Sequence, residues 1–248
     1  MKPVRILAIA GSDSSGGAGI QADIKTITML GGYAMTAITV LTAQDTLGVH
    51  RVDAVAPAMV AAQIAACADI GIDAVKIGML GSPGVAEVVA ERIAAMAVPV
   101  VFDPVMAATS GAVLADTATT AAFEPLMRMA TLTTPNTAEL AALGGPDGMA
   151  ARGIAWLAKG GDATGPVVID VLTLADGTSL RFEGSRIDTR HTHGTGCTLS
   201  SAIATFLGMG LPLPEAIDRA RGFVRSALRA APGFGAGAGP LGHAQARG

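Results

Sequence analysis

The chain has 248 residues, of which 50% are hydrophobic and 15% are charged, and its formal net charge is -3. This length and composition allow a large core, and we expect a single domain that spans residues 1–248. The small negative charge and the absence of a long Lys/Arg run argue against nucleic acid and anionic membranes as partners, because both need concentrated positive charge.

Aromatic and cysteine usage narrows the class of protein further. Aromatic residues make up only 3% of the chain, too few for the base-stacking platforms of proteins that bind single-stranded nucleic acid. Cys67 and Cys197 lie far apart, whereas a secreted disulfide framework shows several closely spaced cysteines. The apolar stretch at 6–10 is too short for a signal-peptide core, and the interrupted stretch at 54–72 is typical of a core-facing helix. We therefore expect a cytoplasmic protein with a small-molecule partner.

Short apolar runs alternate with helical patterns along most of the chain. Continuous apolar runs, without alternating polar residues, are typical of strands that are buried on both faces. Strands are predicted at residues 6–10, 37–41, 74–78, 98–102 and 167–172, and helices at 19–30, 57–70, 84–96, 197–207 and 214–230. Such alternation predicts an α/β fold with a mostly parallel central sheet that is flanked by helices on both faces.

The last third of the chain departs from this rhythm at two places. Ala175-Asp176-Gly177 provides a hairpin-type turn between two extended runs within residues 167–182, which predicts a local antiparallel edge. Residues 232–248 are rich in Gly and Ala and lack periodicity, so we expect an irregular tail. No internal repeat and no linker that would divide the chain is visible in the sequence.

A glycine- and serine-rich loop at residues 11–19 follows the first predicted strand and precedes a helix. Such a loop lets the backbone approach a ligand and directs helix N–H groups toward it. Residues 17–22 match the dinucleotide pattern G-x-G-x-x-[GA], but that fingerprint needs its first glycine at the strand end, and here six residues intervene. A P-loop is excluded, because no Gly is followed by Lys-Ser or Lys-Thr. An ordinary strand-to-helix turn is the remaining alternative.

A second glycine-rich loop opens the helix predicted at 197–207. Gly194 and Gly196 bracket Thr195, so successive backbone N–H groups can point into one concavity, where the helix dipole adds positive potential. A phosphoryl group in transit carries negative charge on its equatorial oxygens. The loop therefore predicts an anion hole that stabilises the transition state of phosphoryl transfer.

Cys197 occupies the N-terminus of that helix, an environment that lowers a thiol pKa from its ordinary value of about 8.5. This placement predicts that Cys197 accepts a proton from an attacking hydroxyl. The alternative is a small buried apolar residue beside a simple turn. His191 and His193 alternate as metal ligands on a strand would, but no third ligand follows at a suitable spacing.

Several separate motifs, taken in order, resemble the hydroxymethylpyrimidine/phosphomethylpyrimidine kinases of the ribokinase-like superfamily. They lie at residues 10–23, 76–80, 103–106, 134–136 with Glu139, 192–197, and in the tail at Gly239-Pro240-Leu241 and His243. The resemblance runs almost from end to end. It implies ATP-dependent, Mg²⁺-assisted phosphorylation of 4-amino-5-hydroxymethyl-2-methylpyrimidine and of its monophosphate in thiamine biosynthesis, by a homodimer. Two alternatives remain open: a pyridoxal kinase, and a non-catalytic pyrimidine-binding module.

The resemblance also implies roles for individual residues. It places the pyrimidine pocket at Gly11, Asp23, Gln44, Met79 and Val105, the ATP phosphates at Asp103, Lys159, Asn136 and Glu139, and the catalytic anion hole at Gly194, Thr195, Gly196 and Cys197. Asp103 and Glu139 would hold Mg²⁺ directly or through water, as this ion prefers oxygen ligands. Cys197 occupies the position at which sugar kinases of the wider superfamily usually carry an aspartate base.

Some of these residues also have plain structural explanations. Gln44 suits a strand cap, Asp103 lies before a proline and suits a turn, Asp23 suits the dipole at the start of a helix, and Glu139 suits a solvated helix surface.

The chain departs from the family pattern before Lys159. The segment between Asn136 and Lys159 is shorter than in the family, and the helix and strand that precede the lysine are compressed into residues 149–158. If residues 154–158 were helical, Lys159 would not reach the phosphates. Asp162 also stands where the family more often has His.

Overall fold

The computed structural model describes residues 2–108, 111–112 and 114–246. Within these ranges the strands form one nine-stranded sheet in the order β3-β2-β1-β4-β5-β6-β7-β8-β9. The strands are β1 (Arg5–Asp13), β2 (Tyr33–Gln44), β3 (Val49–Ala54), β4 (Ala74–Ile77), β5 (Val100–Phe102), β6 (Leu132–Thr133), β7 (Trp156–Ala158), β8 (Val167–Thr173) and β9 (Ser179–Ser185). The helices are α1 (Gly19–Met29), α2 (Pro57–Cys67), α3 (Pro83–Ile93), α4 (Thr117–Ala121), α5 (Glu124–Met129), α6 (Thr137–Ala142), α7 (Gly145–Ala151), α8 (Thr195–Gly208), α9 (Leu213–Arg229) and the 3-10 helix η1 (His243–Gln245).

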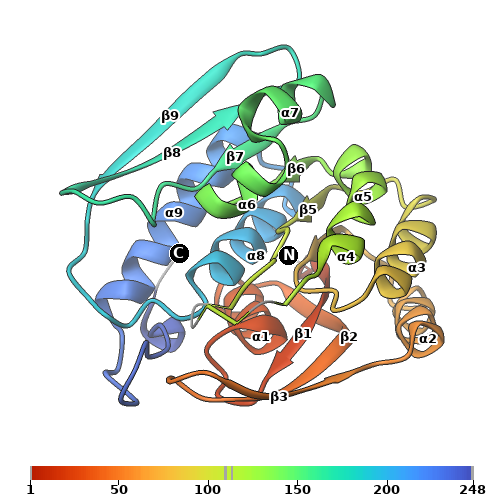
Figure 1. Ribbon diagram of the computed structural model, residues 1–248, viewed down its shortest axis with the longest axis horizontal. Helices are drawn as coiled ribbons and strands as arrows, with labels where there is room; N and C mark the ends of the chain where they lie inside the picture. The colour runs from red at the N-terminus through yellow and green to blue at the C-terminus, as the bar shows by residue number, and fades with distance from the viewer. Residues whose placement is uncertain (1, 109–110, 113, 247–248) are drawn as a thin grey trace.

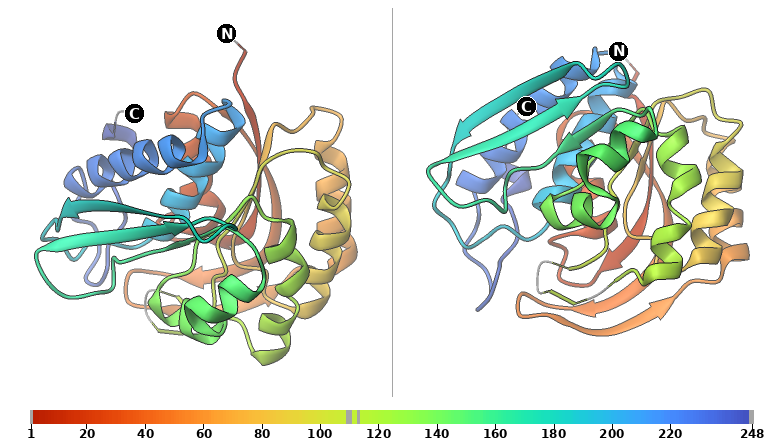
Figure 2. Two further views of the ribbon diagram at one scale, coloured as in Figure 1. Left: turned by 90° about the horizontal axis from the view of Figure 1, so that it is seen from above. Right: turned by 45° about the horizontal axis from the view of Figure 1, so that its top comes forward.

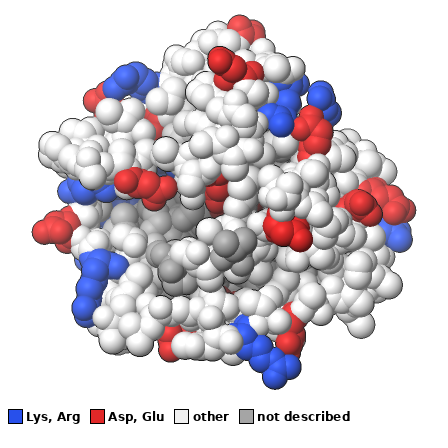
Figure 3. Space-filling view, in the orientation of Figure 1, with Lys and Arg blue, Asp and Glu red and all other residues white. Residues whose placement is uncertain are grey.

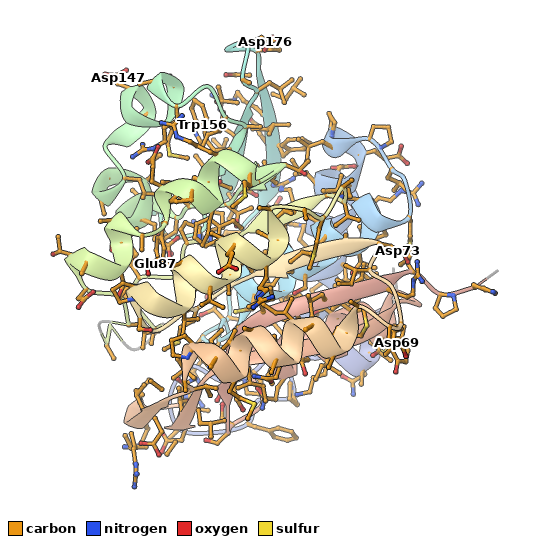
Figure 4. All side chains as sticks on the ribbon, turned by 90° about the vertical axis from the view of Figure 1, so that its right-hand side faces the viewer. Asp69, Asp73, Glu87, Asp147, Trp156 and Asp176 are labelled. Carbon is orange, nitrogen blue, oxygen red and sulfur yellow. The ribbon has the colours of Figure 1, made fainter. Side chains whose placement is uncertain are left out.

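The sheet is mostly parallel, as the alternation of strands and helices predicts. β2, β1, β4, β5, β6 and β7 run parallel to their neighbours in that series. β3 pairs antiparallel with β2 at one edge, and β8 and β9 continue antiparallel from β7 at the other. The predicted antiparallel hairpin is therefore confirmed, and Asp176 lies at its tip (Figure 4).

Helices cover both faces of the sheet, and β1 shows how the two cores are separated. Successive side chains of a strand point to opposite faces. Ile6 and Ala8 pack into the core formed with α8 and α9, whereas Leu7 and Ile9 pack into the core formed with α2, α3 and α5. Figures 1 and 2 show α8 and α9 on one side of the sheet and α2 to α5 on the other. This explains why the strand has a continuous apolar sequence.

Prediction from the sequence underestimates strands that are short or that lie near solvent. β2 has 12 residues, of which only the central part was predicted, because its outer half carries exposed and half-buried side chains. β3 was missed because most of its residues are exposed and show no apolar pattern. β6 was missed because it has only two residues. Periodicity detects buried faces, so short or exposed elements leave little signal.

The shortened segment before Lys159 contains both a helix and a strand. α7 ends at Ala151, and β7 then runs parallel to β6 and antiparallel to β8. Trp156 is 5% exposed and packs into the core, and Figure 4 shows it beneath α7. Because residues 156–158 are extended and not helical, Lys159 emerges at the carboxyl end of a sheet strand.

The tail from residue 232 is mostly irregular over its described part, with η1 as a short regular element. It packs closely nonetheless, since Leu241, His243 and Ala246 are all less than 5% exposed. The side chain of His243 lies 2.8 Å from Thr198 Oγ1 in α8. Burial lowers the pKa of His243 to about 4, from an ordinary value of 6.5.

The free energy of unfolding is expected to decrease by about 3 kcal/mol as the pH falls from 6.5 to 4. In this range His243 becomes protonated in the unfolded chain but stays largely neutral in the folded protein. Urea unfolding of the wild type and of His243→Gln across this range measures the effect. The glutamine variant should show a flatter dependence on pH. Equal slopes in the two proteins would contradict a buried neutral histidine.

We also examined the helices for possible membrane spans. In the described ranges, none of them combines the length and the apolar character that a bilayer span requires.

Candidate active site

A cavity of about 530 Å³ opens at the carboxyl ends of the parallel strands, between the loop after β1 and the β8–β9 hairpin. Open α/β sheets bind ligands at this edge. The cavity is lined by every residue that the sequence assigns to the site except Asp23: Gly11, Gln44, Met79, Asp103, Val105, Asn136, Glu139, Lys159, Gly194, Thr195, Gly196 and Cys197. Figure 3 shows the face hollowed beneath the hairpin, with charged side chains of both signs scattered around it.

The second glycine-rich loop forms the floor of this cavity at the start of α8. Gly194 has φ +87°, and a side chain there would place its Cβ 1.8 Å from the carbonyl oxygen of Gly17. Glycine is therefore required by backbone conformation and by space. The N–H of Thr195 donates to the Thr192 carbonyl, which leaves the first-turn N–H groups of Gly196 and Cys197 for an anion.

Cys197 lies where two helix N-termini converge. Its thiol is part of the start of α8, and the backbone N–H of Gly19, the first residue of α1, hydrogen-bonds to the sulfur. Burial nonetheless raises the pKa of Cys197 to about 11, and the nearby charge of Lys76 only partly offsets this. The expectation that the helix N-terminus lowers this pKa is therefore wrong. Removing the thiolate from water costs more free energy than its interaction with the helix N-terminus contributes.

Asp103, Lys159 and Glu139 form a charged cluster at the centre of the cavity. Lys159 Nζ lies 2.7 Å from Asp103 Oδ1 and 3.7 Å from Glu139 Oε2, and the two carboxylates are almost completely buried. Thr134 Oγ1 also donates to Asp103, at 3.0 Å. Burial alone would lower the pKa of Lys159, but the two carboxylates outweigh it and raise this pKa. Gly196 lies against this cluster, since a Cβ there would lie 3.4 Å from Lys159 Nζ.

Asn136 and Glu139 also have a local structural role. Asn136 caps α6 by accepting a hydrogen bond from the Glu139 N–H at 2.8 Å, and Glu139 accepts one from the Asn136 N–H at 2.7 Å. This reciprocal capping box holds the Glu139 carboxylate in place beside Lys159. Burial raises the pKa of Glu139.

Asp23 does not line the cavity, which corrects its assignment to the pyrimidine pocket. Its side chain is fully buried, and both carboxylate oxygens accept hydrogen bonds from Lys76 Nζ at 2.9 Å. Ser201 Oγ donates to the same carboxylate at 2.6 Å. The charges of both members of the pair act on the pKa of the Cys197 thiol, Lys76 lowering it and Asp23 raising it.

Gln44 ends β2 and lines the same cavity, as do Gly11, Met79 and Val105. A Cβ on Gly11 would come 3.2 Å from Met79 Sδ, so the absent side chain keeps this region open. The Gln44 backbone exchanges two hydrogen bonds of 2.8 Å with Ser14 Oγ. These contacts tie the strand end to the first glycine-rich loop.

A buried ion pair holds the backbone next to Lys159, and sequence reasoning missed it. Asp170 accepts hydrogen bonds from the Gly160 N–H at 2.9 Å and from Arg221 Nε at 2.7 Å. Gly160 has no room for a side chain, since a Cβ would lie 1.9 Å from the Ile169 carbonyl oxygen. A charged residue within the apolar strand at 167–172 was the available signal.

Metal ligands are sparse in the described part of the chain. No group of three or more His, Cys, Asp or Glu side chains is arranged there to hold a metal ion. Asp103 and Glu139 are two hard oxygen donors that lie in the same cavity on either side of Lys159, and such donors suit an Mg²⁺ ion that keeps part of its water shell.

Comparison with known proteins gives consistent matches over nearly the whole chain. Residues 13–242 match the family model described as phosphomethylpyrimidine kinase. The hydroxymethylpyrimidine/phosphomethylpyrimidine kinase of Rhizobium meliloti is 42% identical over 255 residues and is covered to 96%, as is this chain. The thiamine biosynthesis bifunctional protein ThiED of Geobacter sulfurreducens is 43% identical over 264 residues, but this chain spans only 52% of its length.

Solved structures show the same fold. The ADP complex of Bacillus subtilis pyridoxal kinase has a TM-score of 0.89 and 34% identity, with 98% of each chain covered. The phosphomethylpyrimidine kinase of Clostridium difficile has a TM-score of 0.75 and 34% identity, with 90% of this chain and 99% of that chain covered. The architecture is therefore ribokinase-like, as the resemblance in the sequence implies.

Proposed function

The chain belongs to the phosphomethylpyrimidine kinase family, and we propose that its cavity holds ATP and an aminopyrimidine alcohol on opposite sides of the α8 N-terminus. It is a phosphotransferase that acts on hydroxymethylpyrimidine and on its monophosphate in thiamine biosynthesis. One observation carries the proposal for the site: a single cavity joins the Gln44 region to the cluster of Asp103, Lys159 and Glu139.

In the first reaction, the substrate hydroxyl oxygen attacks the γ-phosphorus of ATP, the bond to the leaving ADP oxygen breaks, and the hydroxyl proton departs. Met79 and Val105 provide apolar surface for the ring, and the N–H groups of Gly196 and Cys197 face the charge that develops on the phosphoryl oxygens. The Cys197 sulfur takes up the hydroxyl proton in its thiolate form, which is a small fraction of the protein near neutral pH because burial raises the pKa of this thiol to about 11. In the second reaction the attacking atom is a phosphate oxygen, which is already largely ionised near neutral pH.

ATP is the phosphate donor, and Mg²⁺ is its expected partner. Asp103 and Glu139 would hold the ion, directly or through water, and its charge would neutralise phosphate oxygens. Lys159 lies between the two carboxylates and is placed to contact the phosphates from the protein side. Asn136 contributes by capping α6 and so holding Glu139 in position.

Lys159→Met is expected to lower kcat/KM for ATP by about 100-fold, because a buried cation that faces the phosphates is lost. The variant also leaves Asp103 and Glu139 without their counter-charge. Steady-state kinetics with varied ATP measures the loss. Lys2→Met, at the chain's start and remote from the cavity, is the matched control. An unchanged KM and kcat would remove Lys159 from the phosphate site.

The function is tested by ATP consumption with Mg²⁺ and hydroxymethylpyrimidine, its monophosphate or pyridoxal in parallel. Turnover of both pyrimidines is the expected result. Turnover of pyridoxal alone would favour pyridoxal kinase, the second candidate, which the structural match to the Bacillus subtilis enzyme supports. Binding of the pyrimidine without ATP consumption would indicate a non-catalytic module.

The proposed enzyme is a cytoplasmic, single-domain homodimer that binds no nucleic acid. Three exposed apolar side chains in and beside β2 and β3 support a second copy of the chain as partner: Leu41, Leu47 and Val52. Apolar side chains at a sheet edge are often covered by another subunit. Light scattering at micromolar concentration tests the proposal, and a monomer mass would contradict it.

A further inference from the structure

His193 joins three segments of chain at the wall of the cavity, although no role was assigned to it. Its side chain is 8% exposed. Its Nε2 lies 2.8 Å from Asp13 Oδ2 at the end of β1 and 2.9 Å from the side-chain amide of Gln44 at the end of β2. The residue therefore connects the first glycine-rich loop to a residue that lines the substrate side of the cavity.

The hydrogen bonds of Asp13 show which form of the histidine is present. Its carboxylate accepts from the Ser15 N–H and Ser15 Oγ at 2.8 Å, from the Gly17 N–H at 3.0 Å and from the Ala18 N–H at 2.8 Å. A group surrounded by donors is ionised, and these donors together with His193 hold the pKa of Asp13 at about 2. His193 Nε2 must then carry a hydrogen, which it donates to Asp13, whatever the state of Nδ1.

This hydrogen determines the orientation of the Gln44 amide. The oxygen and nitrogen of a side-chain amide are assigned from their hydrogen bonds, since their shapes are nearly identical. Gln44 Nε2 is the amide atom placed 2.9 Å from His193 Nε2. Two donors cannot face each other at that distance, so we assign the amide in the reverse orientation, in which the carbonyl oxygen shares the Nε2 hydrogen with Asp13. The NH₂ group of Gln44 consequently points away from His193.

His193 is held in place by two contacts with the backbone. A Cβ on Gly17 would lie 2.3 Å from His193 Cδ2, so the imidazole ring packs directly on the first loop. The His193 N–H also donates to the Gly239 carbonyl in the tail, at 3.2 Å. The amide orientation is thus imposed by a rigid neighbour before any ligand arrives.

We propose that His193, held by Asp13, fixes the Gln44 amide with its NH₂ group toward the substrate, so that the site selects a heterocycle with a ring-nitrogen lone pair at that point. His193 is a positioning residue in this scheme, and Gln44 is the contact. The inference rests on the proposed function, because it concerns recognition of the same aminopyrimidine alcohol.

The test compares this alcohol with two analogues, each of which has one ring nitrogen replaced by C–H. Wild-type kcat/KM is expected to fall about tenfold for one analogue, as for the loss of a single hydrogen bond. In His193→Leu the discrimination should fall to near unity, while KM for ATP stays unchanged. His193→Gln should retain it, because its amide can still donate to Asp13. Gln44→Glu, which removes the donor, should lose it.

The control is His50→Leu, since His50 is an exposed histidine that pairs with Asp45; this variant should discriminate as the wild type does. The inference is overturned if the wild type accepts both analogues equally, if His193→Leu still discriminates, or if its KM for ATP rises in parallel. Gln44→Glu and His193→Gln keep the test decisive if His193→Leu does not fold. A wild type that turns over no pyrimidine would refute the proposed function as well.

Discussion

Replacing Cys197 with alanine is expected to lower kcat for hydroxymethylpyrimidine by about 10²- to 10³-fold, with little change in KM for ATP. The alanine keeps the backbone N–H groups at the start of α8 and removes only the sulfur, whose thiolate form takes up the hydroxyl proton. The effect on the second reaction should be much smaller, since a phosphate oxygen attacks without proton removal by the enzyme. Steady-state kinetics with the two substrates separates these effects.

The same variant tests how turnover of hydroxymethylpyrimidine depends on pH. Because burial raises the pKa of Cys197 to about 11, the thiolate fraction grows about tenfold per pH unit below that value. Turnover of hydroxymethylpyrimidine by the wild type should therefore rise between pH 7 and 9, and Cys197→Ala should lose that rise. The rise should be absent with the monophosphate.

Cys67→Ala provides the matched control, because Cys67 ends α2 and does not line the cavity. Its kinetics should equal those of the wild type. Unchanged turnover of hydroxymethylpyrimidine by Cys197→Ala would remove the proton-acceptor role. Equal losses with both substrates would instead indicate that the thiol supports the shape of the anion hole.

Lys76→Met should decrease the free energy of unfolding by about 3–5 kcal/mol, the largest effect on stability that we expect. Lys76 and Asp23 are both fully buried, and their ion pair satisfies two oxygens and one ammonium group away from water. Burial would lower the pKa of Lys76, but the charge of Asp23 outweighs it and raises this pKa. Methionine keeps the volume and leaves a buried carboxylate without its counter-ion.

Urea unfolding at pH 7 measures this loss, and two further variants interpret it. The double variant Lys76→Met/Asp23→Leu should recover most of the stability, because it leaves no unpaired charge in the core. Arg51→Met removes an exposed pair with Asp53 and should change stability by less than about 1 kcal/mol. A single Lys76→Met variant as stable as the wild type would show that the ion pair contributes no net stability.

The location of this pair also affects the Cys197 thiol. The positive charge of Lys76 lowers the pKa of the Cys197 thiol, whereas the charge of Asp23 raises it. A core ion pair therefore influences a group that lines the cavity, although neither of its members is exposed there. In this way the charge of Asp23 reaches Cys197 without Asp23 lining the cavity.

Much of the site was predictable because it depends on short motifs. The glycines at 194 and 196 are needed for a backbone that turns tightly and directs N–H groups into a concavity. A pair of closely spaced glycines before a helix can be recognised in the sequence. The resemblance points to twelve positions, from Gly11 to Cys197, that line one cavity, since parallel strands bring their carboxyl ends to one edge.

The sequence by itself determined the alternation of strands and helices along most of the chain, the mostly parallel sheet and the two glycine-rich loops, because apolar periodicity and glycine requirements are local properties. Only the tertiary structure decided the state of the charged groups. The raised pKa of Cys197, the withdrawal of Asp23 to Lys76 and the contact of His193 with Gln44 each join residues far apart in the chain. Burial and charge pairing act through space, so no local pattern could report them.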